Sequence, residues 1–329
     1  MIITSSFPGA PLGQFNGHLQ TLVPGIRRRV SGVDYQRERI TTPDDDFLDL
    51  DWVQQGHRRL VVLTHGLEGD SGRQYIRGMA KFFGQHGWDA LAWNCRSCSG
   101  EMNRAFRMYH HGDIEDIQTV VHHALKTHKY DTLALVGFSM GGNITMKYLG
   151  VLGDKAPAQI RAAVAFSSPC DIAAGADVLD RWDNTLYKVR FMRALSQKIQ
   201  VKNEHFPGKI NLGKLKAVRR WRDFDEWFSA PLCGFGSAAE FHEQASAKNF
   251  VAGIRVPTLL ISALNDPILT PACFPVDIAR EHPFFHLEMP AGGGHCGFQV
   301  RGEKEVAWSE RRALEFVEGV LEEGKITTQ

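Results

Sequence analysis

Thr132-Leu133-Ala134-Leu135-Val136-Gly137-Phe138-Ser139-Met140-Gly141-Gly142-Asn143 is the stretch that decides the fold. Leu133 to Val136 is continuously apolar, which is typical of a central parallel strand covered on both faces. A helical spacing follows from Asn143 to Leu149. Between strand and helix, residues 137–141 match G-x-S-x-G, a tight turn that lifts a serine hydroxyl above a sheet and has room only for small neighbours. The alternative is a Gly-rich turn that binds phosphate or simply connects two elements.

Around this stretch, short apolar strands alternate with helical segments. The further strands that we expect are Val33–Thr41, Phe47–Gln54, Leu60–Thr64, Asp89–Trp93, Ile160–Phe166, Val256–Ser262 and Phe285–Met289. The expected helices are Ser71–Gln85, Asp113–Thr127, Ala272–Glu281 and Glu303–Leu321. The first two strands are separated by a turn and predict an antiparallel edge pair. The pattern predicts an α/β fold with a mostly parallel eight-stranded sheet flanked by helices.

The alternation also predicts how the chain is organised. Residues 1–32 are rich in Gly and Pro, which predicts an arm without regular structure. Residues 33–170 and 251–329 form the predicted core. Residues 171–250 are polar, basic and aromatic without a clear buried strand, so we expect a helical lid insertion there. The prediction is a single domain over 1–329.

The bulk composition excludes some classes of partner. The 329 residues are 43% hydrophobic and 23% charged, which predicts a folded chain with a large core. A net charge of +1 gives no general attraction to nucleic acid. Two basic runs, Arg27-Arg28-Arg29 and Lys214 to Arg222, are typical of solvated faces, with peripheral contact to an anionic membrane as the alternative.

The sequence has no apolar run near the roughly 18 to 20 residues of a membrane-spanning helix, and its first residues do not resemble a signal peptide. We therefore expect a cytoplasmic protein. Six scattered cysteines are expected to be free thiols. Cys95-Arg96-Ser97-Cys98 spells C-x-x-C, but no second pair completes a zinc site, so we expect neither metal nor redox function.

A serine nucleophile needs a base, and the base needs a carboxylate that holds its tautomer. In the α/β-hydrolase arrangement the chain order is Ser, acid, His, with acid and His after the last strands. Asp266 follows the strand that ends at Ser262, and His295 follows the strand that ends near Met289. We predict Ser139, Asp266 and His295 as the catalytic triad. Asp171, which follows the strand after the serine turn, is the main rival for the acid.

The developing oxyanion needs two preorganised backbone donors. Met140, directly after the serine, supplies the first predicted N–H. His65-Gly66-Leu67-Glu68-Gly69 follows an earlier strand, and the N–H of Leu67 is the second candidate. We expect His65 to orient this loop rather than to transfer protons.

A competing pattern begins at His111. His111-Gly112-Asp113-Ile114-Glu115-Asp116 fits the H-x-x-x-x-D pattern of some acyltransferases, in which the histidine activates an alcohol. The same residues are also typical of the acid-rich first turn of a helix.

Several blocks together resemble a known family. They are Phe15-Asn16-Gly17-His18-Leu19-Gln20-Thr21-Leu22, His65-Gly66-Leu67-Glu68-Gly69 with Tyr75-Ile76, Tyr109-His110-His111-Gly112, residues 137–143, Ser167-Ser168-Pro169, Asn265-Asp266-Pro267 and Gly293-Gly294-His295-Cys296-Gly297-Phe298. The set is similar to the YheT-like branch of the α/β-hydrolase superfamily, also called the AB hydrolase 4 family, and spans almost the whole chain.

The resemblance implies Ser139, Asp266 and His295 as the triad, in a family of esterases, lipases and acyltransferases on medium or long acyl chains. Two blocks depart from the family pattern. The usual Arg-Gly-Cys-Ser-Gly is here Arg96-Ser97-Cys98-Ser99-Gly100, and a tyrosine-rich segment is replaced by Phe241-His242-Glu243.

Taken together, the sequence predicts a serine hydrolase that cleaves small-molecule or lipid-like carboxylic esters, with an apolar acyl chain and no metal or organic cofactor. Two alternatives remain open. One is an acyltransferase that delivers the acyl group to an alcohol, and the other is a non-catalytic binding module on the same fold. The sequence predicts no oligomeric state.

Overall fold

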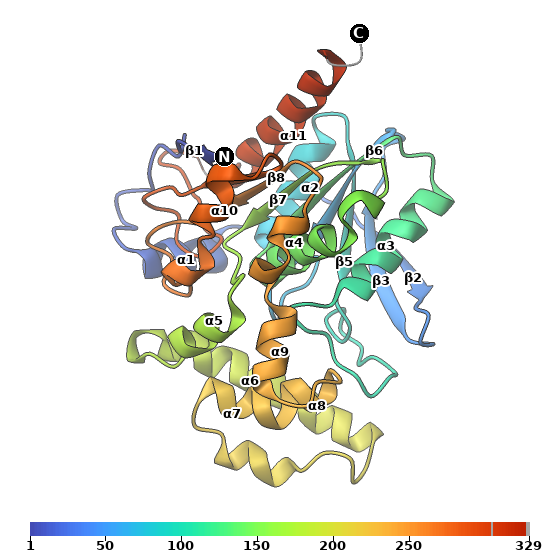
Figure 1. Ribbon diagram of the computed structural model, residues 1–329, viewed down its shortest axis with the longest axis vertical. Coiled ribbons are helices and arrows are strands. Elements are labelled where there is room, and N and C mark those ends of the chain that lie inside the picture. The colour runs from blue at the N-terminus through green and yellow to red at the C-terminus, as the bar shows by residue number, and fades with distance from the viewer. Residues whose placement is uncertain (304, 327–329) are drawn as a thin grey trace.

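The computed structural model describes residues 1–303 and 305–326. Within these residues, nine strands form one sheet in the order β1-β9-β8-β7-β6-β4-β5-β3-β2 (Figure 1). The strands are β1 (Ile2–Ile3), β2 (Gln36–Thr41), β3 (Phe47–Val53), β4 (Arg59–Thr64), β5 (Asp89–Asn94), β6 (Thr132–Phe138), β7 (Ile160–Phe166), β8 (Thr258–Ile261) and β9 (Phe285–Glu288). The first seven strands in this order, β1 through β5, are all parallel to one another, and β3 is antiparallel to both β5 and β2. The α/β prediction is confirmed, with one strand more than expected.

Helices cover both faces of the sheet. Helices α2 (Gln74–Gly84) and α11 (Trp308–Ile326) pack on one face, and α3 (Ile114–Thr127), α4 (Met140–Leu152) and α10 (Val276–Glu281) pack on the other. Along β6, Leu133 and Leu135 point toward the second group while Ala134 and Val136 point toward the first. The strand is apolar without alternation because both of its faces are covered.

The N-terminal prediction is wrong in one respect, since residues 1–32 contain regular structure. Helix α1 (Gly17–Arg27) begins where the Asn16 side chain accepts a hydrogen bond from the Leu19 N–H at 2.9 Å. Gly17 packs so close to the loop after β8 that a Cβ at this position would lie 1.8 Å from the Asn265 carbonyl oxygen. Tertiary contact therefore stabilises a helix that its Gly and Pro content did not predict. Residues Ile2–Ile3 add β1 beside β9.

The antiparallel pair is confirmed, but only one member lies at the edge. β2 is the last strand, whereas β3 lies between β2 and β5 and is buried except at Val53. The closing helix was predicted from Glu303 and begins at Trp308; residue 304 lies outside the described residues.

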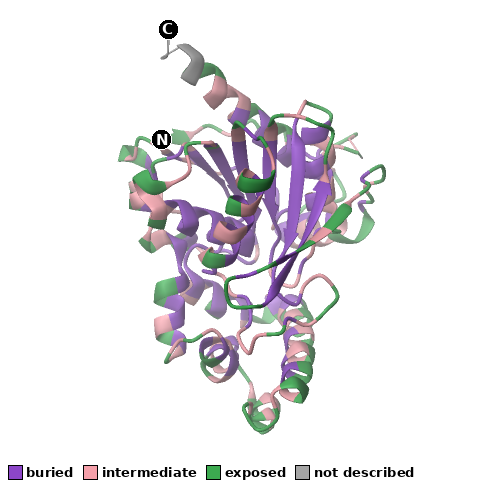
Figure 2. Cartoon of the chain, turned by 90° about the vertical axis from the view of Figure 1, so that its right-hand side faces the viewer, coloured by how far each residue is buried: buried purple, intermediate pink, exposed green. Residues whose placement is uncertain are grey.

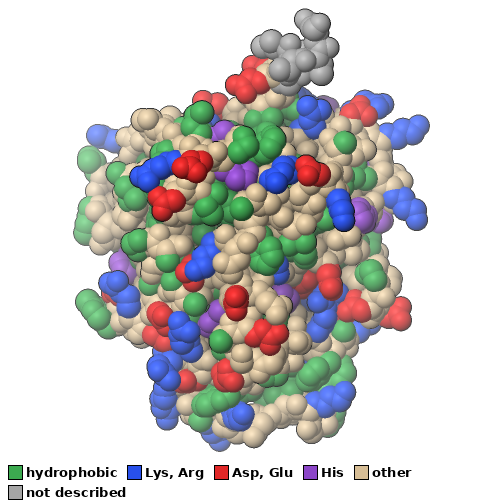
Figure 3. Space-filling view, viewed as in Figure 1, with side chains coloured by type: hydrophobic (Ala, Val, Ile, Leu, Met, Phe, Trp, Pro, Cys, Tyr) green, Lys and Arg blue, Asp and Glu red, His purple; other side chains and the backbone are tan. Residues whose placement is uncertain are grey.

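Between β7 and β8 the chain forms a group of helices below the sheet in Figure 1. They include α5 (Ile172–Leu179), α6 (Thr185–His205), α7 (Trp221–Phe224), a π-helical turn (Asp225–Ser229), α8 (Ala230–Leu232) and α9 (Ala238–Ala245). Figure 2 shows that the central strands of the sheet are buried, whereas the edge strand β2 is largely exposed and these helices are exposed on their outer sides. Figure 3 shows acidic and basic side chains interspersed over the same part of the molecule.

In the part of the chain that the structure describes, none of the helices combines the length and the apolar character that crossing a bilayer requires.

Candidate active site

Ser139 lies at the turn between β6 and α4, at the carboxyl end of the central strand. Its backbone has φ 54° and ψ −119°, a strained conformation for a residue with a side chain. A Cβ on Gly137 would lie 2.2 Å from the Gly141 carbonyl oxygen, and one on Gly141 would lie 2.2 Å from the Thr64 carbonyl oxygen. Both flanking glycines therefore have the steric reason that the G-x-S-x-G pattern predicts.

The predicted residues meet at this turn. His295 Nε2 lies 2.8 Å from Ser139 Oγ, and His295 Nδ1 lies 2.8 Å from Asp266 Oδ2. The Asp266 side chain is fully buried, and its other oxygen accepts the Ile268 N–H at 2.9 Å. The buried Asp266 carboxylate can only accept a hydrogen bond, so Nδ1 of His295 carries the imidazole proton and donates it. Nε2 is then free to accept a hydrogen bond from the serine hydroxyl. The arrangement can move a proton from Ser139 to His295.

The rival acid lies elsewhere. Asp171 caps α5, since its side chain accepts the Ala174 N–H at 3.1 Å, and it forms an ion pair with Lys248. Its carboxylate is engaged in holding the start of the helical insertion. The structure thus favours Asp266 as the partner of His295.

The H-x-x-x-x-D residues are not brought together. Asp116 is held by Arg96 at 2.8 Å and Arg107 at 3.0 Å, and burial raises its pKa to about 6. His111 lines a cavity instead, and burial lowers its pKa to about 4. Among the described residues, no hydrogen bond joins the His111 ring to Asp116. These residues therefore form structural contacts rather than a second catalytic pair.

The predicted oxyanion loop approaches the serine closely. A Cβ on Gly66 would lie 3.1 Å from the Ser139 Cβ, so only glycine fits without a shift. Among the described residues, the N–H groups of Leu67 and Met140 make no hydrogen bond within the protein. Met140 is the first residue of α4, so its N–H belongs to the positive end of a helix. Both donors are available to a ligand.

His65 and Tyr75 hold this loop in place. His65 Nδ1 lies 2.8 Å from the Gly66 carbonyl oxygen, and its Nε2 accepts the Cys95 N–H at 3.0 Å. Burial lowers the pKa of His65 to about 4, so the ring is neutral and donates through Nδ1. The Tyr75 hydroxyl accepts the Gly66 N–H at 3.2 Å. His65 therefore has the orienting position that the sequence predicts.

Helix α1 contributes residues that sequence reasoning did not assign to the site. Thr21 Oγ1 accepts the His295 N–H at 2.8 Å, and Gln20 Oε1 accepts the Gly293 N–H at 2.6 Å. Asn265 Oδ1 accepts the Gly294 N–H at 3.0 Å. These contacts fix the backbone of the His295 loop. The signal that could have located them was the family block at residues 15–22, which contains both Gln20 and Thr21.

Cavities adjoin Ser139 on two sides. One includes Arg73, Arg190 and Ile26 in its lining and opens between α1, α2 and α6; its space, with the open solvent at its mouth, is about 820 Å³. Another is lined mainly by apolar residues of α5 and its neighbours, including Ile172 and Leu179, and its space, measured in the same way, is about 470 Å³. Ser139, His295 and Leu67 line both. The candidate nucleophile thus lies next to a cavity with charged side chains in its lining, referred to below as the polar cavity, and next to a cavity lined mainly by apolar residues.

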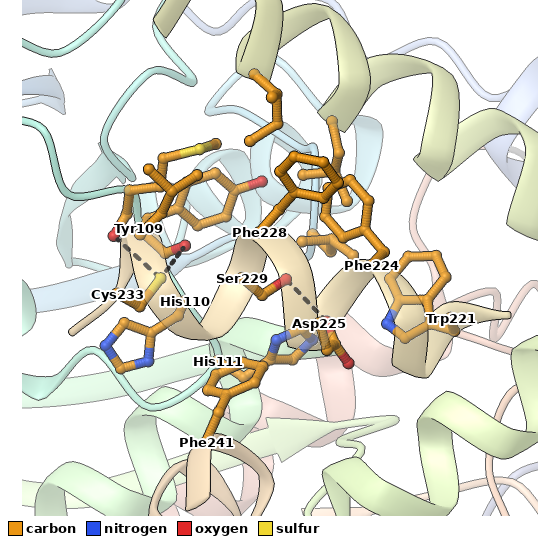
Figure 4. Close-up of a pocket in the computed structure, with 15 residues that line it drawn as sticks. Tyr109, His110, His111, Trp221, Phe224, Asp225, Phe228, Ser229, Cys233 and Phe241 are labelled. Carbon is orange, nitrogen blue, oxygen red and sulfur yellow. Dashed lines mark hydrogen bonds between the residues drawn. The ribbon is translucent and has the colours of Figure 1, made fainter. Parts of the chain in front are cut away.

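The apolar space adjoins a further cavity, whose lining shares Leu67, His111 and Trp221 with it. Figure 4 shows this cavity, with the rings of Phe224 and Phe228 on one wall and His111 beside Asp225 on another. The polar wall is itself hydrogen-bonded, because Asp225 accepts from Ser229 at 2.8 Å and contacts His242 Nε2 at 2.7 Å.

The oxyanion loop is also tied to the helical insertion. Lys198 on α6 donates to Glu68 Oε1 at 2.8 Å and to Cys98 Sγ at 3.2 Å. Tyr109 also donates to the Glu68 carboxylate. A movement of α6 would therefore displace the loop that carries the Leu67 N–H.

The C-x-x-C segment is explained by local structure. Cys95 and Cys98 are free thiols, and burial raises the pKa of Cys98 to about 11. Ser97 occupies φ 62°, the left-handed region where the family pattern has glycine, and its hydroxyl bonds to Asn103 Oδ1 at 2.6 Å. The departure from the family block thus keeps the backbone turn and adds a side-chain contact.

Comparison with known proteins shows which family the chain resembles. A family model described as "Serine aminopeptidase, S33" matches residues 55–274. YheT from Escherichia coli (strain K12) is 33% identical over 303 residues, which cover 90% of this chain and 88% of YheT. Phospholipase ABHD3 from Mus musculus is 28% identical over 93% of this chain and 76% of its own length.

Among solved structures, the esterase Pf2001 of Pyrococcus furiosus superimposes with a TM-score of 0.58 at 17% identity, covering 88% of this chain and 97% of that chain. This likeness shows the α/β-hydrolase fold. The family match and the identity with YheT go further, and they confirm the sequence prediction: the chain belongs to the YheT-like family, or AB hydrolase 4 family, of the α/β-hydrolase superfamily.

Proposed function

We propose that the protein is a serine hydrolase that cleaves carboxylic esters through an acyl-enzyme on Ser139. The observation that carries the proposal is the position of His295, whose two ring nitrogens lie 2.8 Å from Ser139 Oγ and 2.8 Å from Asp266 Oδ2. In this mechanism Nε2 takes the serine proton while Oγ attacks the acyl carbonyl carbon. Asp266 stabilises the imidazolium that forms.

The tetrahedral intermediate then carries a negative oxygen between the N–H groups of Leu67 and Met140. Neither donor makes a hydrogen bond to any described residue of the protein, and Met140 adds the positive end of α4. Collapse of the intermediate releases the alcohol, which takes the proton from His295. Water next attacks the acyl-enzyme with His295 again as the base, and this step releases the acid and restores Ser139.

The acyl part of the substrate is proposed to be an apolar chain. The cavities that lead away from Ser139 past Trp221 are lined mainly by aliphatic and aromatic side chains. Burial of an alkyl chain there removes apolar surface from water, which favours binding by about 0.8 kcal/mol per methylene group. A short acyl group would leave the second cavity empty.

The helical insertion is proposed to act as a lid within a single domain whose core is residues 33–170 and 251–329. Residues 171–250 supply Phe191 and Trp221 to the cavity walls beside Ser139. The insertion is also joined to the oxyanion loop through Lys198 and Glu68. A lid in this position would exclude water from the acyl chain and complete the site around it.

Hydrolysis of p-nitrophenyl esters graded from acetate to palmitate tests the proposal. Wild-type protein is expected to prefer acyl chains longer than acetate, and Ser139→Ala should lower kcat by at least about a thousandfold. Ser196→Ala on α6 serves as a matched control, because Ser196 lines none of the cavities next to Ser139. Folded wild-type protein that turns over none of these esters would contradict the proposal.

A further inference from the structure

The polar cavity beside Ser139 contains two arginine side chains. Arg73 precedes α2 and Arg190 lies on α6, and both line the space that Ser139 and His295 also line. The two side chains come from different parts of the chain, Arg73 from the core and Arg190 from the helical insertion. This cavity is larger than the apolar cavity that also reaches Ser139.

Among the described residues, no carboxylate forms an ion pair with either arginine. Arg73 donates to the Glu68 carbonyl oxygen at 2.7 Å, and Arg190 makes no hydrogen bond or ion pair among the described residues. Glu68 is the acidic residue of the cavity lining, and its carboxylate already binds Lys198 and Tyr109. The cavity therefore carries excess positive charge next to the candidate nucleophile.

The two guanidinium groups are close enough to repel. Burial, followed by the charge of Arg73, lowers the pKa of Arg190, and the smaller opposing effects of Tyr75 and Glu68 do not offset this. Like charges that line one cavity cost free energy, and an anion placed between them removes that cost. Guanidinium groups present planar pairs of N–H donors, which match the oxygens of phosphate and carboxylate groups.

We propose that Arg73 and Arg190 form a subsite for an anionic group, a phosphate or a carboxylate, on the alcohol part of the ester. This inference rests on the proposed ester hydrolysis. With the acyl chain in the apolar cavities past Trp221, the leaving alcohol is directed into the opposite, polar cavity. The substrate class is then an apolar acyl ester of an alcohol that carries a negative charge.

The test compares octanoyl esters of glycerol, glycerol 3-phosphate and glyceric acid below their aggregation concentrations. Wild-type protein is expected to have a kcat/KM for at least one anionic ester about tenfold or more above that for the neutral ester. The anionic ester with the higher value identifies the group that the subsite takes. In Arg73→Gln, Arg190→Gln and the double variant, this ratio should fall toward one.

Arg193→Gln is the matched control. Arg193 lies on the same helix as Arg190, is exposed, and lines none of the cavities next to Ser139. This variant removes the same charge from the same helix, so an effect of overall charge would change the ratio in this variant as well. We expect its ratio to match wild type.

A second measurement separates this proposal from the proposed function. Calorimetric binding of the same three esters to Ser139→Ala is expected to show tighter binding of the anionic esters, and this preference should be lost in Ser139→Ala with both arginines replaced. Wild-type protein that hydrolyses the esters with a ratio unchanged by Arg73→Gln and Arg190→Gln would overturn the subsite alone. Absence of hydrolysis would overturn the proposed function, and absence of any binding preference would overturn the subsite independently.

Discussion

The backbone N–H of His295 donates to Thr21 Oγ1 at 2.8 Å, and this contact joins the candidate base to a helix more than 270 positions earlier in the chain. Thr21 itself donates to the Gly17 carbonyl oxygen at 2.7 Å, so its hydroxyl is fixed by α1. The first turns of α1 therefore act as a support for the loop that carries His295. Thr21 is a positioning residue in this account.

Thr21→Val should lower kcat for p-nitrophenyl octanoate by about tenfold, because the isosteric side chain leaves the His295 N–H without its acceptor. Thr21→Ser keeps the hydroxyl and should restore most of the activity. Both variants are to be compared at equal folded fraction, measured by thermal unfolding. An equal loss of kcat in Thr21→Val and Thr21→Ser would show that the Thr21 hydroxyl does not position His295.

Asp266→Asn should lower kcat by about a thousandfold or more, since an amide in this position no longer holds the required tautomer of His295. Asp171→Asn provides the matched comparison, because Asp171 was the rival acid and contacts Lys248 rather than His295. We expect Asp171→Asn to affect stability more than kcat. A larger kcat loss in Asp171→Asn than in Asp266→Asn would reverse the assignment.

The core of the fold was predictable because its signals are local. The strand Leu133 to Val136 is apolar at every position, and the helices on both faces of the sheet require this. Ser139, Asp266 and His295 were predictable because each follows a strand, and parallel strands end at one edge of the sheet.

The contacts of α1 were not predictable in the same way. Glycine is required at position 17 because the Asn265 backbone packs against it. The Gln20 side chain accepts a hydrogen bond from the Gly293 N–H, which is far away in the sequence. A polar side chain that binds distant backbone leaves no periodic pattern around itself. The cavities could not be predicted for the same reason, since the walls of the one beside α5 combine residues from Leu67 to His295 that meet only after folding.

Gly66→Ala should lower kcat strongly with little change in fold. The added Cβ would lie 3.1 Å from the Ser139 Cβ, and relief of this contact must shift the loop that carries the Leu67 N–H. Loss of one oxyanion donor typically costs about a hundredfold or more in kcat. Gly319→Ala is the control, because a Cβ at that helical position meets nothing within 4 Å. Equal kcat in the two variants would argue against the assigned loop.

The buried His110 side chain is expected to lower the free energy of unfolding in acid. Burial lowers its pKa from 6.5 to about 3, so the unfolded chain binds a proton at His110 between these pH values and the folded chain does not. The free energy of unfolding should therefore fall as the pH drops below 6.5, by up to about 1.4 kcal/mol per pH unit from this group.

His110→Asn removes this titration and retains an acceptor for the Gly112 N–H, which His110 Nδ1 accepts at 3.2 Å. Urea unfolding at several pH values between 6.5 and 4 should show a shallower decline of stability in the variant than in wild type. Because other titrating groups are common to both proteins, they cancel in the difference. Parallel curves would mean that His110 is protonated in the folded state or does not titrate differently on unfolding.

The most direct test of the central claim is covalent labelling of the nucleophile by a fluorophosphonate, read by intact mass and peptide mapping. The account predicts one adduct on wild-type protein, located on the peptide that contains Ser139, no adduct on Ser139→Ala, and much slower labelling of His295→Ala. An adduct on another residue, or labelling of Ser139→Ala at the wild-type rate, would contradict the claim that His295 activates Ser139 for attack on an ester.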